Sequence, residues 1–524
     1  MPRSVKLRLA PFLLLAALAA LFVVGCGGGD DGGSGDADPA TIAPVKTPVF
    51  IDFMVRPDAE TGKNIDALAE KIAGVDNVGE LIIGELENSA SEGDEEFDYE
   101  KEVEPWLGEK GGLFLQEYED DDFEGYGAAI QTSDEDAARD FIFKQVEADE
   151  DEEVKDGSYE GVDFKVEEDE TTFGVFDGLV AFAEDEATFK TMVDAANGEN
   201  LAGEDTYTST VADVPDGSAA NVYVDIGALI EESGDEIDDE TRLFLDGVGI
   251  EPDEATAVAS LVPGSDQIEI DFSTNLSGEN PPTGDASELL GSLPATSVGA
   301  FAAAEFGERF NESIDQIDKQ GIPSEGIEPG ELKKGLKQAG IDLESIAGSI
   351  GDVGAYVTGN SESTLGGALI MEAEDATQAK NTVSNIGLFL RSANVPGVTS
   401  IKGKASGFSI RDPELGRQPV VVAAKGSRIA IGYGLASTLS AFEEASKTLA
   451  DLPAYKDAVS ALGDTPITAF VDGPAALNLA SALIPPGEEE FEAAEQYLEK
   501  IDYIAVGSEA SGGLATAKLI VGVK

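Results

Sequence analysis

The sequence predicts an α+β fold: two homologous units, each a mostly antiparallel sheet with packed helices, after a signal peptide and a flexible tether. Short apolar runs alternate with segments of helical periodicity. Neighbouring strand candidates are joined by short turns such as Asp177-Gly178, a dipeptide typical of hairpins. The regular strand–helix alternation of a parallel sheet is missing. Several phrases also recur, in the same order, about 240–250 residues later.

The composition limits the chemistry that the chain can perform. With 524 residues, 42% of them hydrophobic, the chain is long enough for two or three domains with buried cores. Its 104 acidic and 33 basic residues give a net charge of −71, which disfavours nucleic acid as a partner. The sequence has no histidine, which excludes histidine-dependent catalysis and histidine zinc sites, and its one cysteine cannot form an internal disulfide. We therefore expect no catalytic residues, no metal and no cofactor.

The first 25 residues have the pattern of a secretory signal peptide. Arg3, Lys6 and Arg8 precede an uncharged apolar run over residues 9–24. A permanent membrane-spanning helix usually needs about 20 apolar residues, and this run is shorter. The pattern therefore predicts export from the cytoplasm.

The end of this run, Val23-Val24-Gly25-Cys26, resembles the lipobox of bacterial lipoproteins. The resemblance implies cleavage between Gly25 and Cys26 and attachment of lipid to Cys26, which places the protein outside the cytoplasm on the cell membrane. Two or more acyl chains anchor a protein stably where one does not. The alternative is a conventional signal peptide with an incidental cysteine. The position of Cys26, and the lack of a second cysteine, favour lipidation.

The rest of the chain divides into a tether and two repeats. Residues 26–46 are rich in Gly, Asp, Ala and Pro, which predicts a disordered tether that spans roughly 25 Å. Repeated phrases place a first repeat at 47–277, a linker at 278–288 and a second repeat at 289–524. The matching stretches are 49–53 with 297–301, 111–116 with 353–358, 125–141 with 366–382, 177–196 with 427–445, 221–229 with 468–477, and 255–260 with 502–508.

The expected elements of the first repeat follow from local patterning. A helix is expected to begin at Ser133-Asp134, where acidic residues in the first turn suit the helix dipole. The expected strands are residues 49–55, 112–118, 125–131, 161–176, 179–184, 220–225, 254–262 and 267–273, and the expected helices are residues 61–73, 133–147, 185–196 and 227–246.

Three blocks resemble a known bacterial family. Residues 98–115 (DYEKEVEPWLGEKGGLFL), 159–196 and 221–229 are similar to blocks of the family called domain of unknown function 3352. The chain is thus interpreted as two copies of a unit resembling that family. The resemblance implies a secreted or membrane-attached bacterial protein and supplies no activity. The second repeat has LESIAGSIG (343–351) where the first has Trp106, which we expect to be a packing residue.

The two repeats differ in charge. Residues 47–290 carry a net charge of −58, and residues 291–524 carry −13. Salt adaptation would act on both repeats alike, so solvated loops explain the acids more simply. The functional alternative is a basic protein or loosely bound cations on the first repeat. Residues 149–157 lack the glycine that an EF-hand loop needs at its sixth position, so no specific calcium site is expected.

Three functions are compatible with these features. A lipid-anchored, non-enzymatic cell-envelope protein with a binding or scaffolding role ranks first. A carrier of a lipid or another hydrophobic ligand, in a groove between sheet and helices, is the alternative. A hydrolase that uses carboxylates ranks last, because no carboxylate pair stands out among so many. Asp225 and Asp472, at matching places in the two repeats, are expected to cap the next helix.

Overall fold

The computed structural model has two compact units. The described residues up to 275 form unit 1, and those from 284 onward form unit 2. The structure describes residues 37–90, 97–119, 122–147, 153–232, 255–275, 284–320, 328–338, 348, 350–373, 375–403, 405–443, 447–485, 487–511 and 514–524.

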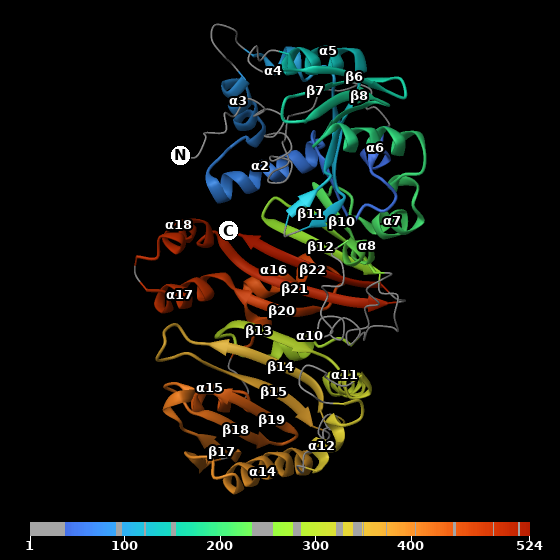
Figure 1. Ribbon diagram of the computed structural model, residues 1–524. Helices are drawn as coiled ribbons and strands as arrows, with labels where there is room; N and C mark the ends of the chain where they lie inside the picture. Colours follow the sequence, from blue (N-terminus) through green and yellow to red (C-terminus); the bar gives the residue numbers. More distant parts are fainter. Residues whose placement is uncertain are drawn as a thin grey trace. The chain divides into compact units, whose positions relative to one another are not determined.

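The elements of unit 1 are mostly short strands with helices between them (Figure 1). Its strands are β1 (Val49–Met54), β2 (Leu107–Leu115), β3 (Glu117–Glu119), β4 (Asp122–Glu124), β5 (Gly127–Thr132), β6 (Lys155–Tyr159), β7 (Val162–Val166), β8 (Thr172–Phe176), β9 (Leu179–Ala183), β10 (Ala220–Asp225), β11 (Thr256–Pro263) and β12 (Gln267–Asn275). Its helices are η1 (Pro39–Ile42), α2 (Ala59–Ala73), α3 (Val78–Ala90), α4 (Tyr99–Glu102), α5 (Glu135–Val146), α6 (Glu186–Asn197), η2 (Leu201–Gly203), α7 (Asp205–Thr210), η3 (Val211–Asp213) and α8 (Ile226–Glu232).

Unit 2 has a corresponding set of elements. Its strands are β13 (Ser297–Ala303), β14 (Ile350–Thr358), β15 (Gly366–Ala373), β16 (Val398–Ser400), β17 (Ser406–Ile410), β18 (Val420–Lys425), β19 (Arg428–Tyr433), β20 (Ile467–Asp472), β21 (Ile501–Ser511) and β22 (Leu514–Val523). Its helices are α10 (Ser287–Ser292), α11 (Phe306–Gln320), α12 (Leu332–Gln338), α14 (Ala376–Ser392), η7 (Pro413–Leu415), α15 (Leu435–Ser440), η8 (Leu449–Asp451), α16 (Pro453–Leu462), α17 (Gly473–Leu483) and α18 (Glu489–Leu498).

The two units have the same strand order. In unit 1 the order is β12-β11-β10-β1-β2-β5-β9-β8-β7-β6, with antiparallel neighbours throughout. In unit 2 it is β22-β21-β20-β13-β14-β15-β19-β18-β17-β16, again antiparallel. The predicted α+β class with antiparallel sheet is therefore confirmed, and each strand in one of these orders has a counterpart in the other, whereas β3 and β4 of unit 1 pair only with each other.

The hairpin between β8 and β9 shows how local sequence sets this order. Asp177 and Gly178 have φ angles of 49° and 76°, as both central residues of a type I′ turn require. The turn fixes the register that places Val175 opposite Val180. In unit 2 the turn between β18 and β19 contains Gly426, with a φ of 64°.

The strand register also refines the sequence comparison. Val49 of β1 pairs with β2 and β10, and Gly299 of β13 pairs with the matching positions of β14 and β20. Gly299 is thus the counterpart of Val49, whereas the sequence comparison matches Val49 with Ser297. A β-bulge adds one residue to β13 between Ser297 and Gly299, directly before this position.

The prediction of a disordered tether over residues 26–46 is wrong for its last part. Residues 39–42 form η1, which Asp38 caps by accepting a hydrogen bond from Ala40 N at 2.9 Å. Ala40, Ile42 and Ala43 have no exposed surface and pack against the sheet. Burial of these apolar side chains holds the segment in place, so unit 1 begins before residue 39.

The same entry segment precedes the first strand of unit 2. In each unit a Pro-x-x-Thr/Ser turn precedes the first strand. The carbonyl oxygen of the residue before the proline accepts a hydrogen bond from the backbone N–H of the leucine that begins a later 3₁₀ helix. The matching bonds are Thr47 Oγ1 to Pro44 O and Ser297 Oγ to Pro294 O, both 2.7 Å, and Leu201 N to Ala43 O and Leu449 N to Leu293 O, both 2.9 Å.

Each sheet has helices on both faces. In unit 1, α6 and α7 cover a core that contains Phe114 and Tyr207, and α5 covers the other face over Phe173. In unit 2, α16 covers a core with Tyr455 and Phe470, and α14 covers the other face. We call the two faces of unit 2 the α16 face and the α14 face.

Several elements differ from the sequence prediction. The expected strand over residues 161–176 is two strands, β7 and β8, because residues 167–171 form a turn. The helix α3 was not predicted. The expected helix over residues 227–246 is seen as α8, and its continuation from residue 233 lies outside the described residues.

Candidate functional site

Few of the residues predicted to carry function can be placed. Gly25 and Cys26 lie outside the described residues, as do residues 149–152 of the acidic run over residues 149–157. Within the described ranges, no helix is long and apolar enough to cross a membrane. In the same ranges, no three Asp, Glu, Cys or His side chains gather closely enough to hold a metal ion.

The aromatic and capping residues named from the sequence have structural roles. Trp106 is 3% exposed, packs against Phe141 with ring centroids 5.6 Å apart, and donates from Nε1 to Glu102 O at 2.7 Å. It is a packing residue, as predicted. Asp225 Oδ1 accepts from Ala228 N and Asp472 Oδ1 from Ala475 N, both at 2.8 Å. Both predicted helix caps are therefore confirmed.

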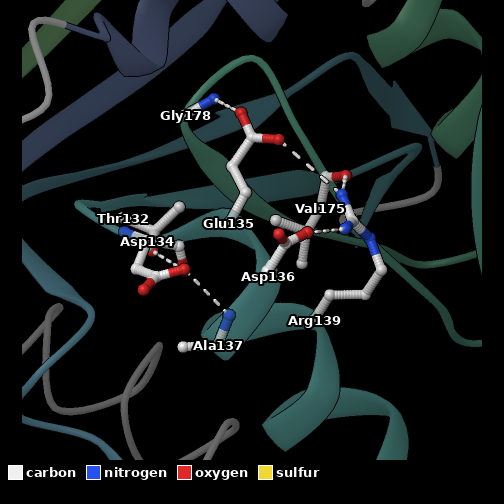
Figure 2. A network of polar contacts seen from close by, with 8 residues as sticks. All are labelled: Thr132, Asp134, Glu135, Asp136, Ala137, Arg139, Val175 and Gly178. Carbon is white, nitrogen blue, oxygen red and sulfur yellow. Dashed lines mark hydrogen bonds and ion pairs between the residues drawn. The ribbon is translucent and has the colours of Figure 1, made fainter.

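A network of charged groups at the start of α5 also has a structural role (Figure 2). Asp134 Oδ1 accepts from Ala137 N at 3.0 Å and caps the helix. Glu135 Oε1 accepts from Gly178 N at 2.7 Å, and Arg139 Nη2 donates to Val175 O at 3.1 Å. These bonds fasten the β8–β9 hairpin to α5, and the carboxylates are occupied by partners within the unit.

Unit 1 has a buried polar cluster around Asp52. Asn221 Nδ2 donates to Asp52 Oδ1 at 2.8 Å, and Ser218 Oγ donates to Asn221 Oδ1. Burial raises the pKa of Asp52 above its usual value, and the bond from Asn221 opposes that rise. The register places Ala302 at the corresponding position in unit 2. These polar groups are held by partners within the unit, and the carboxylate of Asp38 is near enough to add to the rise in the pKa of Asp52.

The hollow with the clearest ligand chemistry is an apolar groove on the α14 face of unit 2. Side chains alternate between the faces of a strand, so Ala300 and Tyr356 point into the α16 face while Phe301 and Val357 point to the other. Phe301 and Val357 are each 45% exposed, and Leu369 is 40% exposed. The register joins Phe301, Ala355, Leu369 and Ile431 into one row across β13, β14, β15 and β19.

Glycines leave the floor of this groove open. A Cβ atom at Gly299 would meet only Val471 Cγ2 at 3.7 Å and Phe470 O at 3.9 Å, so packing does not demand glycine there. The groove has a volume of about 570 Å³ and reaches Tyr433, whose hydroxyl accepts from Gln418 N at 2.9 Å. That volume lies within the roughly 300–1,000 Å³ of ligand pockets.

The corresponding face of unit 1 is filled by side chains. Val49 occupies the place of Gly299 and is 8% exposed. Ile51, the counterpart of Phe301, packs against the cluster that contains Trp106. Tyr126 stands where unit 2 has Gly367, and its ring lies 6.0 Å from that of Phe182. The groove is therefore a property of the unit 2 sequence and not of the fold.

A second hollow in unit 2, of about 650 Å³, lies beside Tyr455 and has a mixed lining. Asp285, Glu288 and Asp464 stand at its edge together with hydroxyl groups. Burial raises the pKa of Tyr455 to about 12, so its hydroxyl is neutral at physiological pH. Apolar residues such as Val459 and Ile467 line this hollow together with the acids, and no basic side chain is among its lining residues.

Sequence reasoning named none of the groove residues. The signal was present in β13, β14 and β15, which read SVGAFAA, IGDVGAYVT and GGALIMEA. These runs are apolar on both faces, unlike a strand with one face in water. Sequence alone cannot distinguish a covered face from an open one.

Comparison with known proteins gives a family and no activity. The family described as "Protein of unknown function (DUF3352)" matches residues 83–512 in one continuous stretch that covers parts of both units. No curated protein matches the chain. A solved structure titled "Structure of crystal form I of TP0453" is 8% identical, with a TM-score of 0.23 over 46% of this chain and 80% of the other.

Proposed function

Because the chain belongs to the DUF3352 family, which brings no activity with it, we propose a function from the chain's own geometry. The protein is a lipid-anchored, non-enzymatic component of the cell envelope, and unit 2 binds the apolar part of a ligand, such as the acyl chain of a lipid. The single observation that carries binding is the open apolar groove over Gly299, Phe301 and Leu369.

Apolar exposure of this kind is unfavourable without a partner. Each Å² of apolar surface removed from water contributes about 25 cal/mol, and contiguous exposed apolar patches on monomers usually mark interaction sites. Phe301, Val357 and Leu369 are neighbours on one sheet face, so they form a patch and not scattered exposures. An acyl chain fits because the groove supplies few polar groups to satisfy a polar ligand.

The lipid anchor at Cys26 and the duplication belong to the same proposal. The apolar run that ends in Gly25-Cys26 supports the anchor. The shared strand order, the two Pro-x-x-Thr/Ser turns and the matching helix caps support two copies of one ancestral unit. In this account unit 2 kept an open face, while unit 1 filled its face and gained acidic loops.

A neutral fluorescent probe, N-phenyl-1-naphthylamine, tests the groove directly. The full mature chain is expected to bind it saturably, and palmitic acid is expected to displace it. Gly299→Val places in the groove the residue that unit 1 carries there, and it should weaken binding about tenfold or more, since each lost buried CH₂ contact is worth about 0.8 kcal/mol.

Gly351→Val is the matched control, because Gly351 lies on β14, is exposed, and would meet only Glu372 O at 3.7 Å. Equal binding by the Gly299→Val and Gly351→Val proteins, or no saturable binding, contradicts the proposal. The anchor is tested separately: labelling of cells with a radioactive fatty acid is expected to label the parent protein and not the Cys26→Ser protein, and probe binding should be the same in both.

A further inference from the structure

One segment of this acidic protein has a positive net charge. From the first residue of α14 to the last of β19, residues 376–433 carry eight basic and two acidic residues, a net charge of +6. The corresponding segment of unit 1, residues 135–183 from α5 to β9, has a net charge of −13. Because the two segments share one strand order, the fold does not require this difference.

The helix α14 is two-sided. Ala379, Val383 and Gly387 are buried against β17 and β18, and a Cβ atom at Gly387 would lie 2.9 Å from the Phe408 ring. The side away from the sheet carries Leu388, 62% exposed, and Phe389, 54% exposed. Two adjacent large apolar side chains therefore protrude into solvent at the last turns of the helix.

Exposed basic side chains lie on the same helix and on the segments that follow it. Lys380 and Arg391 are exposed on α14, and Lys402 and Arg411 are exposed on the segments that follow it. Arg391 Nη2 donates to Ser400 Oγ at 3.2 Å, and Arg411 N donates to Gly397 O at 3.2 Å, which holds these segments beside the end of the helix. Among the described residues, none of the four makes an ion pair. We call these six residues the α14 patch.

We propose that the α14 patch docks on an anionic lipid bilayer. Basic residues gain about 1 kcal/mol each near an anionic membrane surface, and large apolar side chains insert among the headgroups. The apolar pair protrudes from the exposed side of α14 and lines neither of the two hollows described above, so it suits a fluid medium better than a shaped protein surface. The rest of the chain is strongly acidic and is repelled by such a membrane, so the patch selects which side of unit 2 faces it.

The docked orientation presents the groove to the bilayer. Ile431 lines the groove and also packs against the core beneath α14, so the patch and the groove belong to one face of unit 2. Docking itself requires neither an occupied groove nor an acylated Cys26. The two proposals can therefore fail separately.

Sedimentation with vesicles tests the proposal on the mature chain, residues 26–524, with Cys26→Ser to remove the anchor. The protein is expected to bind vesicles of equal parts phosphatidylglycerol and phosphatidylcholine and to bind pure phosphatidylcholine weakly or not at all. Arg391→Glu with Lys402→Glu should weaken binding to the anionic vesicles about tenfold or more. Leu388→Ser with Phe389→Ser should weaken it by a similar factor.

Matched controls come from unit 1. Lys63→Glu with Lys144→Glu removes the same charge from exposed positions, and Leu81→Ser removes a side chain that is 59% exposed. These variants are expected to bind as the parent does, and thermal unfolding should be unchanged in all of them because the altered side chains are exposed. Equal binding to both vesicle types, no binding to either, or indifference to the α14 substitutions overturns the proposal.

Discussion

At the scale of single residues, the two units carry different side chains at equivalent positions of the same strand order. Asp52 in unit 1 is held by Asn221 within a core, and unit 2 has Ala302 at that place. Burial raises the pKa of Asp52, with Asp38 adding to the rise and Asn221 and Lys110 opposing it. The folded state therefore binds this proton more tightly than the unfolded state does.

The sign of this effect gives a prediction. Stability from a raised carboxyl pKa is present at low pH and is lost as the pH rises through the folded-state pKa. Asp52→Asn keeps an oxygen that can accept from Asn221 and removes the titration. Its free energy of unfolding, measured by urea titration, should equal or exceed that of the parent at pH 7 and lose this advantage as the pH falls towards 4.

Asp216→Asn serves as the control for Asp52→Asn, since Asp216 is an exposed carboxylate close to Ser218 in the chain. It removes one formal charge without touching the cluster. Parallel stability curves for the parent and Asp52→Asn across this pH range would show that Asp52 titrates alike in both states and would refute the assignment.

At the scale of elements, equivalent helices begin in equivalent ways. Asp134 caps α5 through Ala137 N at 3.0 Å, and Asp375 caps α14 through Gln378 N at 2.9 Å. Both helices directly follow equivalent strands of the main sheet, β5 and β15. Asp134→Ala should cost about 1 kcal/mol, and Asp375→Ala should likewise destabilise its own unit.

Calorimetry can assign each loss to its unit. One kcal/mol corresponds to about 2–4 °C in Tm for a domain of this size, so each variant should lower one thermal transition and leave the other in place. Asp134→Asn and Asp375→Asn, which keep a capping oxygen, should behave nearly as the parent does. A shift of both transitions by either alanine variant would contradict independent units.

Local sequence patterns predicted well those elements whose structure is determined by residues close together in the sequence. The Asp177-Gly178 hairpin and the helix that starts after Asp134 are where the sequence places them. Residues 37–46 were misjudged because Gly, Ala and Pro predict flexibility, and the contacts that bury Ala40 and Ile42 come from α6 and η2, far along the chain. Long-range burial overrode local composition.

The groove was unpredictable for the same reason. Phe301 would be covered only if a helix crossed its part of the sheet. The packing of the helices decides this, and the alternation of side chains along β13 does not. The sequence comparison did record the relevant contrast, since the second repeat lacks a counterpart of Trp106. The sequence comparison could not show that the unit without this tryptophan also has an uncovered sheet face.

At the scale of the whole molecule, the two units share one strand order and differ in the surfaces they expose. Unit 1 is acidic and has its faces filled, and unit 2 carries both the apolar groove and the α14 patch. Each unit has its own sheet and cores. The proposed anchor at Cys26 keeps the chain at the membrane that supplies the ligand.

Native mass spectrometry of the full chain, extracted from its own membrane in mild detergent, tests the central claim most directly. The groove predicts one noncovalent adduct with the mass of a lipid, present in the parent and the Gly351→Val protein and reduced or lost in the Gly299→Val protein. An adduct-free parent, or an adduct that the Gly299→Val protein retains in full, would contradict a ligand site on the α14 face of unit 2.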